Sequence, residues 1–251
     1  METPAPIEVR DLKLAYGSRV VMENLNFRIN AGEIFIIMGG SGCGKSTLLR
    51  HLIGLQTPAA GTIRLFGNDL NASTPKEREA LLRRFGVMYQ GGALWSSMTL
   101  LENVMLPLEE YTDLHTRERI ELARYKLALV GLSGFENYYP SEISGGMAKR
   151  ASIARAIALD PEILFFDEPG AGLDPLSSKH LDDLTLNIRD SLGTTVVIVT
   201  HELDSIFAIG DRAIFLDAAQ KTLGAIGTPR ELRAHPPSLA IREFLTRAGT
   251  L

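Results

Sequence analysis

The 251-residue sequence contains one cysteine, Cys43, which excludes an intrachain disulfide framework and fits a reducing compartment. It has no apolar run near the ~20 residues that a membrane-spanning helix needs. Its first residues, Met-Glu-Thr-Pro-Ala-Pro, lack the basic and apolar regions of a signal peptide. With 26 basic and 30 acidic residues, its net charge of −4 argues against a nucleic-acid partner. We therefore expect a soluble, cytoplasmic chain.

The hydrophobic pattern predicts one α/β domain. Continuous apolar runs at 34–38, 163–166 and 195–200 are typical of strands covered on both faces, and alternation at 7–14 and 25–29 indicates half-buried strands. Helical patterns follow at 45 onwards, 79–84, 99–108, 116–130, 145–159 and 181–192, and two short ones lie within 229–251. Strands alternating with helices predict a parallel sheet, and the mostly helical block from 75 to 159 predicts an inserted helical subdomain.

A glycine-rich loop directly follows the strand predicted at 34–38 and precedes a helix. It matches the pattern G-x-x-x-x-G-K-[ST] with Gly39, Gly40, Ser41, Gly42, Cys43, Gly44, Lys45 and Ser46. Its backbone N–H groups would cradle phosphate oxygens, with Lys45 reaching the β- and γ-phosphates and Ser46 ligating Mg²⁺. Cys43 occupies an unconstrained position as a small filler. A glycine-rich turn arising by chance is the alternative, with odds on the order of 1%.

An acidic pair ends the strand predicted at 163–166. Asp167 would hold Mg²⁺, and Glu168 would accept a proton from an attacking water. Taken alone, the pair is equally typical of a helix N-cap.

His201 follows the strand at 195–200, where it would contact the γ-phosphate, or else cap a strand. Gln90 ends an apolar stretch, where its amide would touch Mg²⁺ and the nucleophilic water, or else be only a polar strand terminus.

Ser144, Gly145 and Gly146 begin a predicted helix and form a second anion-binding N-terminus. One chain does not need two such sites for one triphosphate. Two chains do, if each presents this helix to the nucleotide held by the other's phosphate loop. The alternative is a simple glycine-rich helix start.

The order of these motifs along the sequence resembles that of the ATP-binding cassette family, and the resemblance covers nearly the whole chain. Residues 39–46 and the adjacent Thr47 match Walker A, Gln90 the Q-loop, residues 144–146 the signature, residues 167–168 Walker B, Asp174 the D-loop and His201 the switch histidine. Tyr16 matches the aromatic residue that stacks on adenine. The resemblance implies a P-loop NTPase with a RecA-like core, an N-terminal antiparallel β subdomain and an inserted α-helical subdomain.

The resemblance also implies how the chain is divided and how it works. A single cassette of residues 1–251 would comprise a core of 1–90 and 159–228, a helical signature subdomain of 91–158 and a helical tail of 229–251. A homodimer would clamp two ATP molecules with Mg²⁺, held by Ser46, Gln90 and Asp167. Glu168 would be the general base, His201 the γ-phosphate sensor, Gln90 the hinge and Asp174 a contact across the dimer.

Several departures from the commonest family pattern resemble the ATPases of Mla and other Mce-associated lipid transporters of Gram-negative envelopes. These are Gly40 in the phosphate loop, Met147 after the signature, and 170–172 (Gly-Ala-Gly) after Walker B. The resemblance implies a place on the cytoplasmic face of the inner membrane under two permease subunits, with a periplasmic Mce-domain protein and a small STAS-domain protein. Leu94 and Trp95 would form a permease groove, or else pack within the helical subdomain.

Three other functions stay open at this point. A cassette for a polar solute shares every catalytic motif and differs only in its partners. A soluble cassette protein acting on DNA or ribosomes would carry long coiled coils or tandem cassettes, which this sequence lacks. A non-catalytic subunit is disfavoured because Glu168 and His201 are both present.

Overall fold

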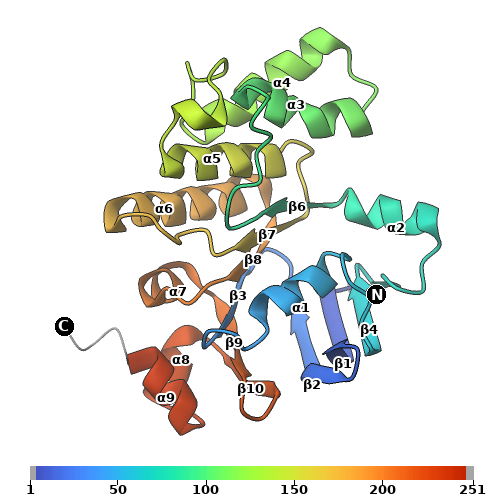
Figure 1. Ribbon diagram of the computed structural model, residues 1–251, viewed down its shortest axis with the longest axis vertical. Helices are drawn as coiled ribbons and strands as arrows, with labels where there is room; N and C mark the ends of the chain where they lie inside the picture. Colours follow the sequence, from blue (N-terminus) through green and yellow to red (C-terminus); the bar gives the residue numbers. More distant parts are fainter. Residues whose placement is uncertain (1–3, 247–251) are drawn as a thin grey trace.

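The computed structural model describes residues 4–246, whose strands form two sheets (Figure 1). The first is antiparallel, in the order β2-β1-β4-β5, with β1 at Ile7–Tyr16, β2 at Arg19–Ile29, β4 at Ala60–Leu65 and β5 at Asn68–Asp69. The second has the order β10-β9-β3-β8-β7-β6, with β3 at Ile34–Gly39, β6 at Phe85–Met88, β7 at Ile163–Asp167, β8 at Thr195–Val199, β9 at Arg212–Asp217 and β10 at Thr222–Gly227. Its strands pair in parallel except at β10, which is antiparallel to β9.

The central strands of the second sheet send alternate side chains into two different cores. In β3, Phe35 and Ile37 pack with the antiparallel sheet and α1, whereas Ile34 and Ile36 pack with the helices on the other face. All these side chains are fully buried. This explains why the sequence runs are continuously apolar: both faces of the sheet are covered.

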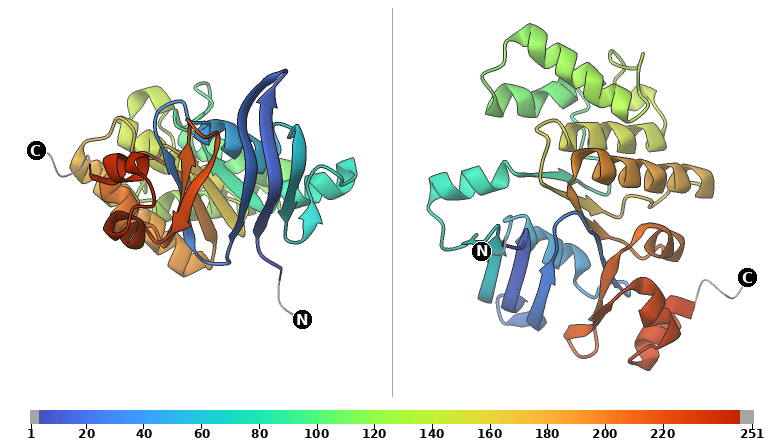
Figure 2. Two further views of the ribbon diagram at one scale, coloured as in Figure 1. Left: turned by 90° about the horizontal axis from the view of Figure 1, so that it is seen from below. Right: turned by 180° about the vertical axis from the view of Figure 1, so that it is seen from behind.

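The helices cover the sheets as Figures 1 and 2 show, with α3, α4 and α5 stacked at one end of the molecule and α8 and α9 on the opposite side of the second sheet from β1 and β2. Their bounds are α1 Lys45–Leu52, α2 Pro75–Leu82, α3 Leu100–Tyr111, α4 Thr116–Leu129, the 3-10 helix η1 Pro140–Glu142, α5 Gly145–Ala156, α6 Pro175–Leu192, α7 Leu203–Ile209, α8 Pro229–Ala234 and α9 Leu239–Thr246. The buried side chains of α3 to α5 join those of the sheet in one continuous core. None of the helices between residues 4 and 246 has the length and apolar character needed to cross a membrane.

The structure confirms the strands predicted at 34–38, 163–166 and 195–200, and corrects two details. The block from 75 to 159 is mostly helical as predicted, but it also contains an unpredicted strand, β6, which pairs with β7 at the sheet edge. The helix expected at 79–84 begins earlier, at Pro75, because Thr74 and Glu77 form a capping box there.

The predicted C-terminal tail consists of two helices, as the sequence pattern indicates. Ile241 and Leu245 of α9 are buried in the core of their own chain, and Phe244 stacks edge-on against Phe215 at 5.4 Å between ring centroids. Residues 247–251 of the tail lie outside the described residues. The described part of the tail therefore packs on the second sheet.

Candidate functional site

The glycine-rich loop lies at the carboxyl end of β3, and its backbone geometry depends on glycine at two positions. Gly39 has a φ of 153°, and a Cβ there would lie 2.7 Å from Cys43 Sγ and 2.8 Å from the carbonyl oxygen of Leu216. Gly44, the N-cap of α1, has a φ of 101°, and its Cβ would lie 2.9 Å from Val21 Cγ1. The loop therefore bends back tightly enough to aim the N-terminus of α1 at a ligand.

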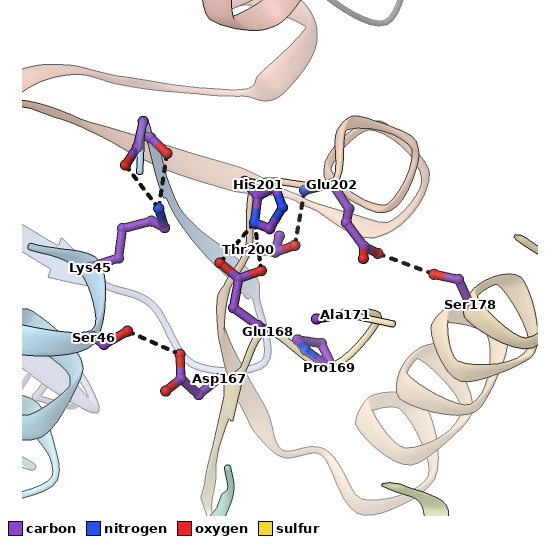
Figure 3. Close-up of polar contacts among 12 residues, drawn as sticks. Lys45, Ser46, Asp167, Glu168, Pro169, Ala171, Ser178, Thr200, His201 and Glu202 are labelled. Carbon is purple, nitrogen blue, oxygen red and sulfur yellow. Dashed lines mark hydrogen bonds and ion pairs between the residues drawn. The ribbon is translucent and has the colours of Figure 1, made fainter. Parts of the chain in front are cut away.

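Lys45 and Ser46 start α1 with their functional groups facing the loop and β7. Lys45 Nζ donates hydrogen bonds to the carbonyl oxygens of Gly39 at 3.0 Å and Gly40 at 3.1 Å, so the cation lies over the loop. Ser46 Oγ donates to Asp167 Oδ1 at 3.5 Å (Figure 3). Desolvation, followed by the charge of Glu168, raises the pKa of Asp167. A bound cation would reverse that effect by favouring the carboxylate.

The hydroxyl of Ser46 and the carboxylate of Asp167 are neighbouring oxygen ligands of the kind that magnesium prefers. Magnesium takes oxygen ligands, uses one or two carboxylates, and fills its other positions with water and substrate phosphates. Residues 4–246 contain no group of three His, Cys, Asp or Glu side chains that would hold a metal by itself. The oxygens present therefore fit an ion that is shared with a phosphate.

Glu168 is held in a backbone conformation that L-residues adopt rarely. It follows the last residue of β7, its φ is 48°, and its N–H donates to the carbonyl oxygen of Val199 in β8 at 2.8 Å. The left-handed turn directs the chain away from the sheet immediately after Asp167. The two neighbouring carboxylates are thereby separated in direction, with Asp167 beside Ser46 and Glu168 beside His201 (Figure 3).

His201 and Glu168 meet at the ends of two adjacent parallel strands. Nδ1 of His201 lies 2.9 Å from Oε1 of Glu168 in a hydrogen bond, and 2.9 Å from Oε2. Among the described residues, Oε2 is buried and has no hydrogen-bond donor of its own. The carboxylate is only 10% exposed, whereas the His201 side chain is 59% exposed. Glu168 is thus nearly buried, with both carboxylate oxygens close to the accessible imidazole of His201.

One cleft of about 1080 Å³ brings most of the predicted site residues together. It is lined by the whole loop from Gly39 to Thr47 and also by Tyr16, Gln90, Glu168 and His201. Tyr16 ends β1, is 47% exposed, and hydrogen-bonds through its hydroxyl to Thr47 Oγ1 at 3.5 Å and Gln56 Oε1 at 3.3 Å. A phosphate chain on the loop would therefore leave an attached base near an aromatic ring.

Five of the predicted site residues do not line this cleft: Asp167, whose carboxylate contacts Ser46 of the lining, and Ser144, Gly145, Gly146 and Asp174. Ser144 caps α5, accepting a hydrogen bond from Met147 N at 3.2 Å, and is exposed. Asp174 caps α6, accepting from the backbone N–H of Leu176 and Ser177, and the Ser177 side-chain hydrogen bond lowers its pKa. A Cβ on Gly146 would lie 3.7 Å from Leu173 Cδ2, so the two helix starts are neighbours.

The sequence pattern missed seven residues that line the cleft. They include Arg19, Lys221 and Phe244, and the others are Val20, Val21, Leu203 and Ala218. Arg19 begins β2, Lys221 lies in the β9–β10 turn, and Phe244 comes from α9. The turn reaches the cleft because Glu23 N donates to the carbonyl oxygen of Lys221 at 2.8 Å. No motif marks these positions. Arg19 lies opposite Tyr16 in the pairing of β1 with β2, whereas the packing of the hairpin and tail brings Lys221 and Phe244 here.

A second cavity, of about 540 Å³, lies between β6 and the helices that follow it. Trp95 lines it and is 58% exposed, together with Phe85, Val87, Pro107 and Tyr111. Leu94 instead packs against the main core. The two residues therefore differ: Leu94 packs inside the chain, whereas Trp95 lines an open groove.

The loop, its sheet and the acidic strand end define a P-loop nucleotide-binding fold. Residues 22–171 match the ABC transporter family, and the chain belongs to this family. The fold predicted from the sequence, a P-loop cassette of the α/β class, is confirmed.

Known proteins with related sequences and structures support the same classification. The chain is 41% identical to the probable ribonucleotide transport ATP-binding protein mkl of Mycobacterium tuberculosis, over 95% of this chain and 66% of that protein. It is 39% identical to the intermembrane phospholipid transport system ATP-binding protein MlaF of Haemophilus influenzae, over 95% of this chain and 89% of that protein. The dimeric structure of the ATP-binding cassette MJ0796, in a post-hydrolysis state with ADP and Pi, superposes with a TM-score of 0.80 at 30% identity, covering 88% of this chain and 98% of that one.

Proposed function

We propose that the protein is the ATP-hydrolysing subunit of a transporter and that it works as a homodimer. The observation that carries this proposal is the position of Glu168, which lines the same cleft as the phosphate loop and the exposed His201. A nucleotide on the loop would place its γ-phosphate toward these two side chains. Such an arrangement suits attack by water on a phosphoryl group.

In this proposal each residue of the cleft has one task. The backbone N–H groups of the loop and Lys45 bind the β- and γ-phosphates and orient them. The Glu168 carboxylate accepts a proton from the attacking water, and His201, which lies against that carboxylate, contacts the γ-phosphate. Tyr16 stacks on the adenine ring.

Ser46, Asp167 and Gln90 would hold a magnesium ion together with the phosphates. The ion would supply positive charge that neutralises the phosphate oxygens. Gln90, which is exposed and lies two residues after β6, is also the hinge of the helical subdomain in this proposal.

Dimer formation follows from the residues outside the cleft. The start of α5, with Ser144, Gly145 and Gly146, lies outside the cleft of its own chain, and Ser144 and Gly145 are exposed. We propose that it binds the nucleotide on the partner's loop, while Asp174, beside it at the start of α6, contacts the partner. The dimeric state of the related cassette MJ0796 supports this arrangement.

We propose a phospholipid or a related hydrophobic molecule as the transported substrate. The similarity to MlaF over 95% of this chain supports it. Two permease subunits would carry the substrate, each docking a segment into the groove lined by Trp95. The protein would then sit at the cytoplasmic face of the inner membrane, with a periplasmic Mce-domain protein and a small STAS-domain protein as further partners.

A polar solute is the second candidate, because the relative mkl is named for ribonucleotide transport. The cleft does not distinguish the two substrates, since both would use the same ATPase. Purification of the assembly from membranes, with mass spectrometry of its chains and bound lipids, tests the choice. Co-purified phospholipid with an Mce-domain chain would support the first candidate, and a solute-binding chain without lipid would support the second.

Catalysis by two chains is tested by diluting the purified protein. ATP hydrolysis per chain should fall as the concentration drops below the dissociation constant of the dimer. Full activity of a strictly monomeric chain at any dilution would contradict the proposal.

A further inference from the structure

Lys149 in α5 is a buried lysine whose contacts are all with the loop after β7. It is 8% exposed, and its Nζ donates to the carbonyl oxygens of Pro169 at 2.6 Å and Ala171 at 2.5 Å, with that of Glu168 at 3.5 Å. Lysine is rarely buried this far without a partner. Here three donors of one ammonium meet three carbonyls of one short loop.

The ammonium forms no ion pair with any carboxylate in the described part of the chain. Burial lowers the pKa of Lys149, and the charges of Glu202 and Glu168 act in the opposite direction. Hydrogen bonds from a charged donor are stronger than neutral ones, which offsets part of the cost of burying the cation. The stabilisation of this lysine therefore depends on the loop keeping its carbonyls turned inward.

The same loop carries the strained residue of the site. Glu168 has a φ of 48°, a conformation that persists only where the surrounding structure holds it. The loop's own backbone supplies two bonds, from Ala171 N to Glu168 O at 3.2 Å and from Leu173 N to Gly170 O at 3.0 Å. Lys149 adds hydrogen bonds to this loop from helix α5, so the position of the Glu168 carboxylate depends on that helix.

Helix α5 is also attached to the loop that carries Gln90. Ser152 Oγ donates to the carbonyl oxygen of Gly92 at 2.8 Å, and Arg155 donates to those of Gly92 and Ala93 at 3.1 and 2.8 Å. A Cβ on Gly92 would lie 2.6 Å from Ser152 Oγ, so this contact is close. One rigid helix, which begins at Ser144 and lies between α3 and α6 (Figure 1), thus contacts both loops of the cleft.

We infer that Lys149 is a positioning residue through which helix α5 sets the location of Glu168 for ATP hydrolysis. The inference rests on the proposed function. When the start of α5 binds the partner's nucleotide, the helix and its three loop contacts move together. Lys149 therefore couples engagement of one ATP to the geometry of the general base in its own chain.

The test compares Lys149→Met and Lys149→Arg with the wild-type homodimer, measuring kcat, KM for ATP and thermal unfolding. Methionine preserves the unbranched apolar stem of the side chain up to Cε but removes the donors. We expect kcat to fall about 10²-fold, as for misplacement of a catalytic group by about 1 Å, with KM within about twofold. Arginine, which still donates to carbonyls, should restore kcat to within about tenfold of wild type.

Lys126→Met provides the matched control. Lys126 lies in α4, is 1% exposed, and pairs with Asp160 at 2.5 Å, away from both cleft loops. Its loss tests the general effect of removing a buried lysine, and kcat should stay within about twofold. If Lys149→Met does not fold, Lys149→Gln replaces it, because the shorter uncharged amide cannot reach all three carbonyls.

A normal kcat in folded Lys149→Met, a loss of kcat that Lys126→Met shares, or a raised KM with unchanged kcat would each overturn the inference. A second measurement traps dimers with ATP in a Glu168→Gln background, where adding Lys149→Met should leave dimer formation intact. Failure of the proposed function gives a different result, because the wild-type protein itself would then bind nucleotide without hydrolysing it.

Discussion

The carboxylate of Glu168 and the imidazole of His201 face each other at 2.9 Å, across the carboxyl ends of two adjacent parallel strands. Both oxygens of the carboxylate lie 2.9 Å from Nδ1 of His201. In a parallel sheet all strands end at one edge, so residues 33 positions apart become neighbours there. Four predictions test this site and its surroundings.

Glu168→Gln should bind ATP normally but lose hydrolysis. The amide keeps a similar shape and can still contact His201, but it cannot accept the proton of the attacking water. We expect kcat to fall by on the order of 10²–10⁴, the usual contribution of a general base. Size-exclusion chromatography with ATP should show a trapped dimer, and sustained multiple-turnover hydrolysis would remove Glu168 from the role of base.

Ser144→Arg should prevent closure of the dimer. Ser144 is exposed at the start of α5, so the bulky cation should leave the fold intact while filling the space a partner's phosphate would occupy. Nucleotide binding to the single chain should persist, because Ser144 does not line the cleft. Equilibrium binding and steady-state ATPase of the fully substituted homodimer are the measurements. Wild-type turnover would argue against a shared site.

Trp95→Glu should weaken association with the permease while the isolated chain still hydrolyses ATP. A charge in the apolar groove would have to be desolvated when a partner docks. Tyr125→Glu is the matched control, because Tyr125 is 57% exposed but lies in α4 outside the groove. Co-purification and transport in membranes are the readouts. If both persist in Trp95→Glu, the partner docks elsewhere.

Asp182→Asn should stabilise the protein at neutral pH. Burial raises the pKa of Asp182 to about 6, with Ser205 donating to it and with the charges of Glu202, Asp183 and Asp204 acting to raise it further. Below its unfolded-state pKa, a carboxyl whose folded-state pKa is raised does not lower the free energy of unfolding. As the pH rises above that value the free energy of unfolding falls, until the pH exceeds the folded-state pKa.

The gain in unfolding free energy for Asp182→Asn should therefore be about 1–2 kcal/mol at pH 7.5, discounted for partial exposure, and should shrink toward pH 5. Urea unfolding at the two pH values measures it. Asp183→Asn, which changes an exposed neighbour, is the control and should show little pH-dependent gain. An equal gain at both pH values would contradict the raised pKa.

The strands that form the site were predictable because burial on both faces requires continuous apolar sequence. The runs before Gly39, Asp167 and His201 all became strands of one parallel sheet. Strand β6 was harder to predict because it is short, lies at the sheet edge and is surrounded by helices. Local pattern carries little information where pairing with β7 decides the structure.

The sequence by itself determined the phosphate loop. The tight backbone turn of this loop requires glycine at positions 39 and 44, between a strand and a helix, and all of these requirements are local. It also placed Asp167, Glu168 and His201 at strand ends. Tertiary structure decided which groups meet there: Lys221 and Phe244 reach the cleft only through packing of distant elements. The same holds for Lys149, whose carbonyl partners lie about 20 positions further along the chain. Contacts between distant residues leave no periodic trace, since each depends on how whole helices and sheets pack together.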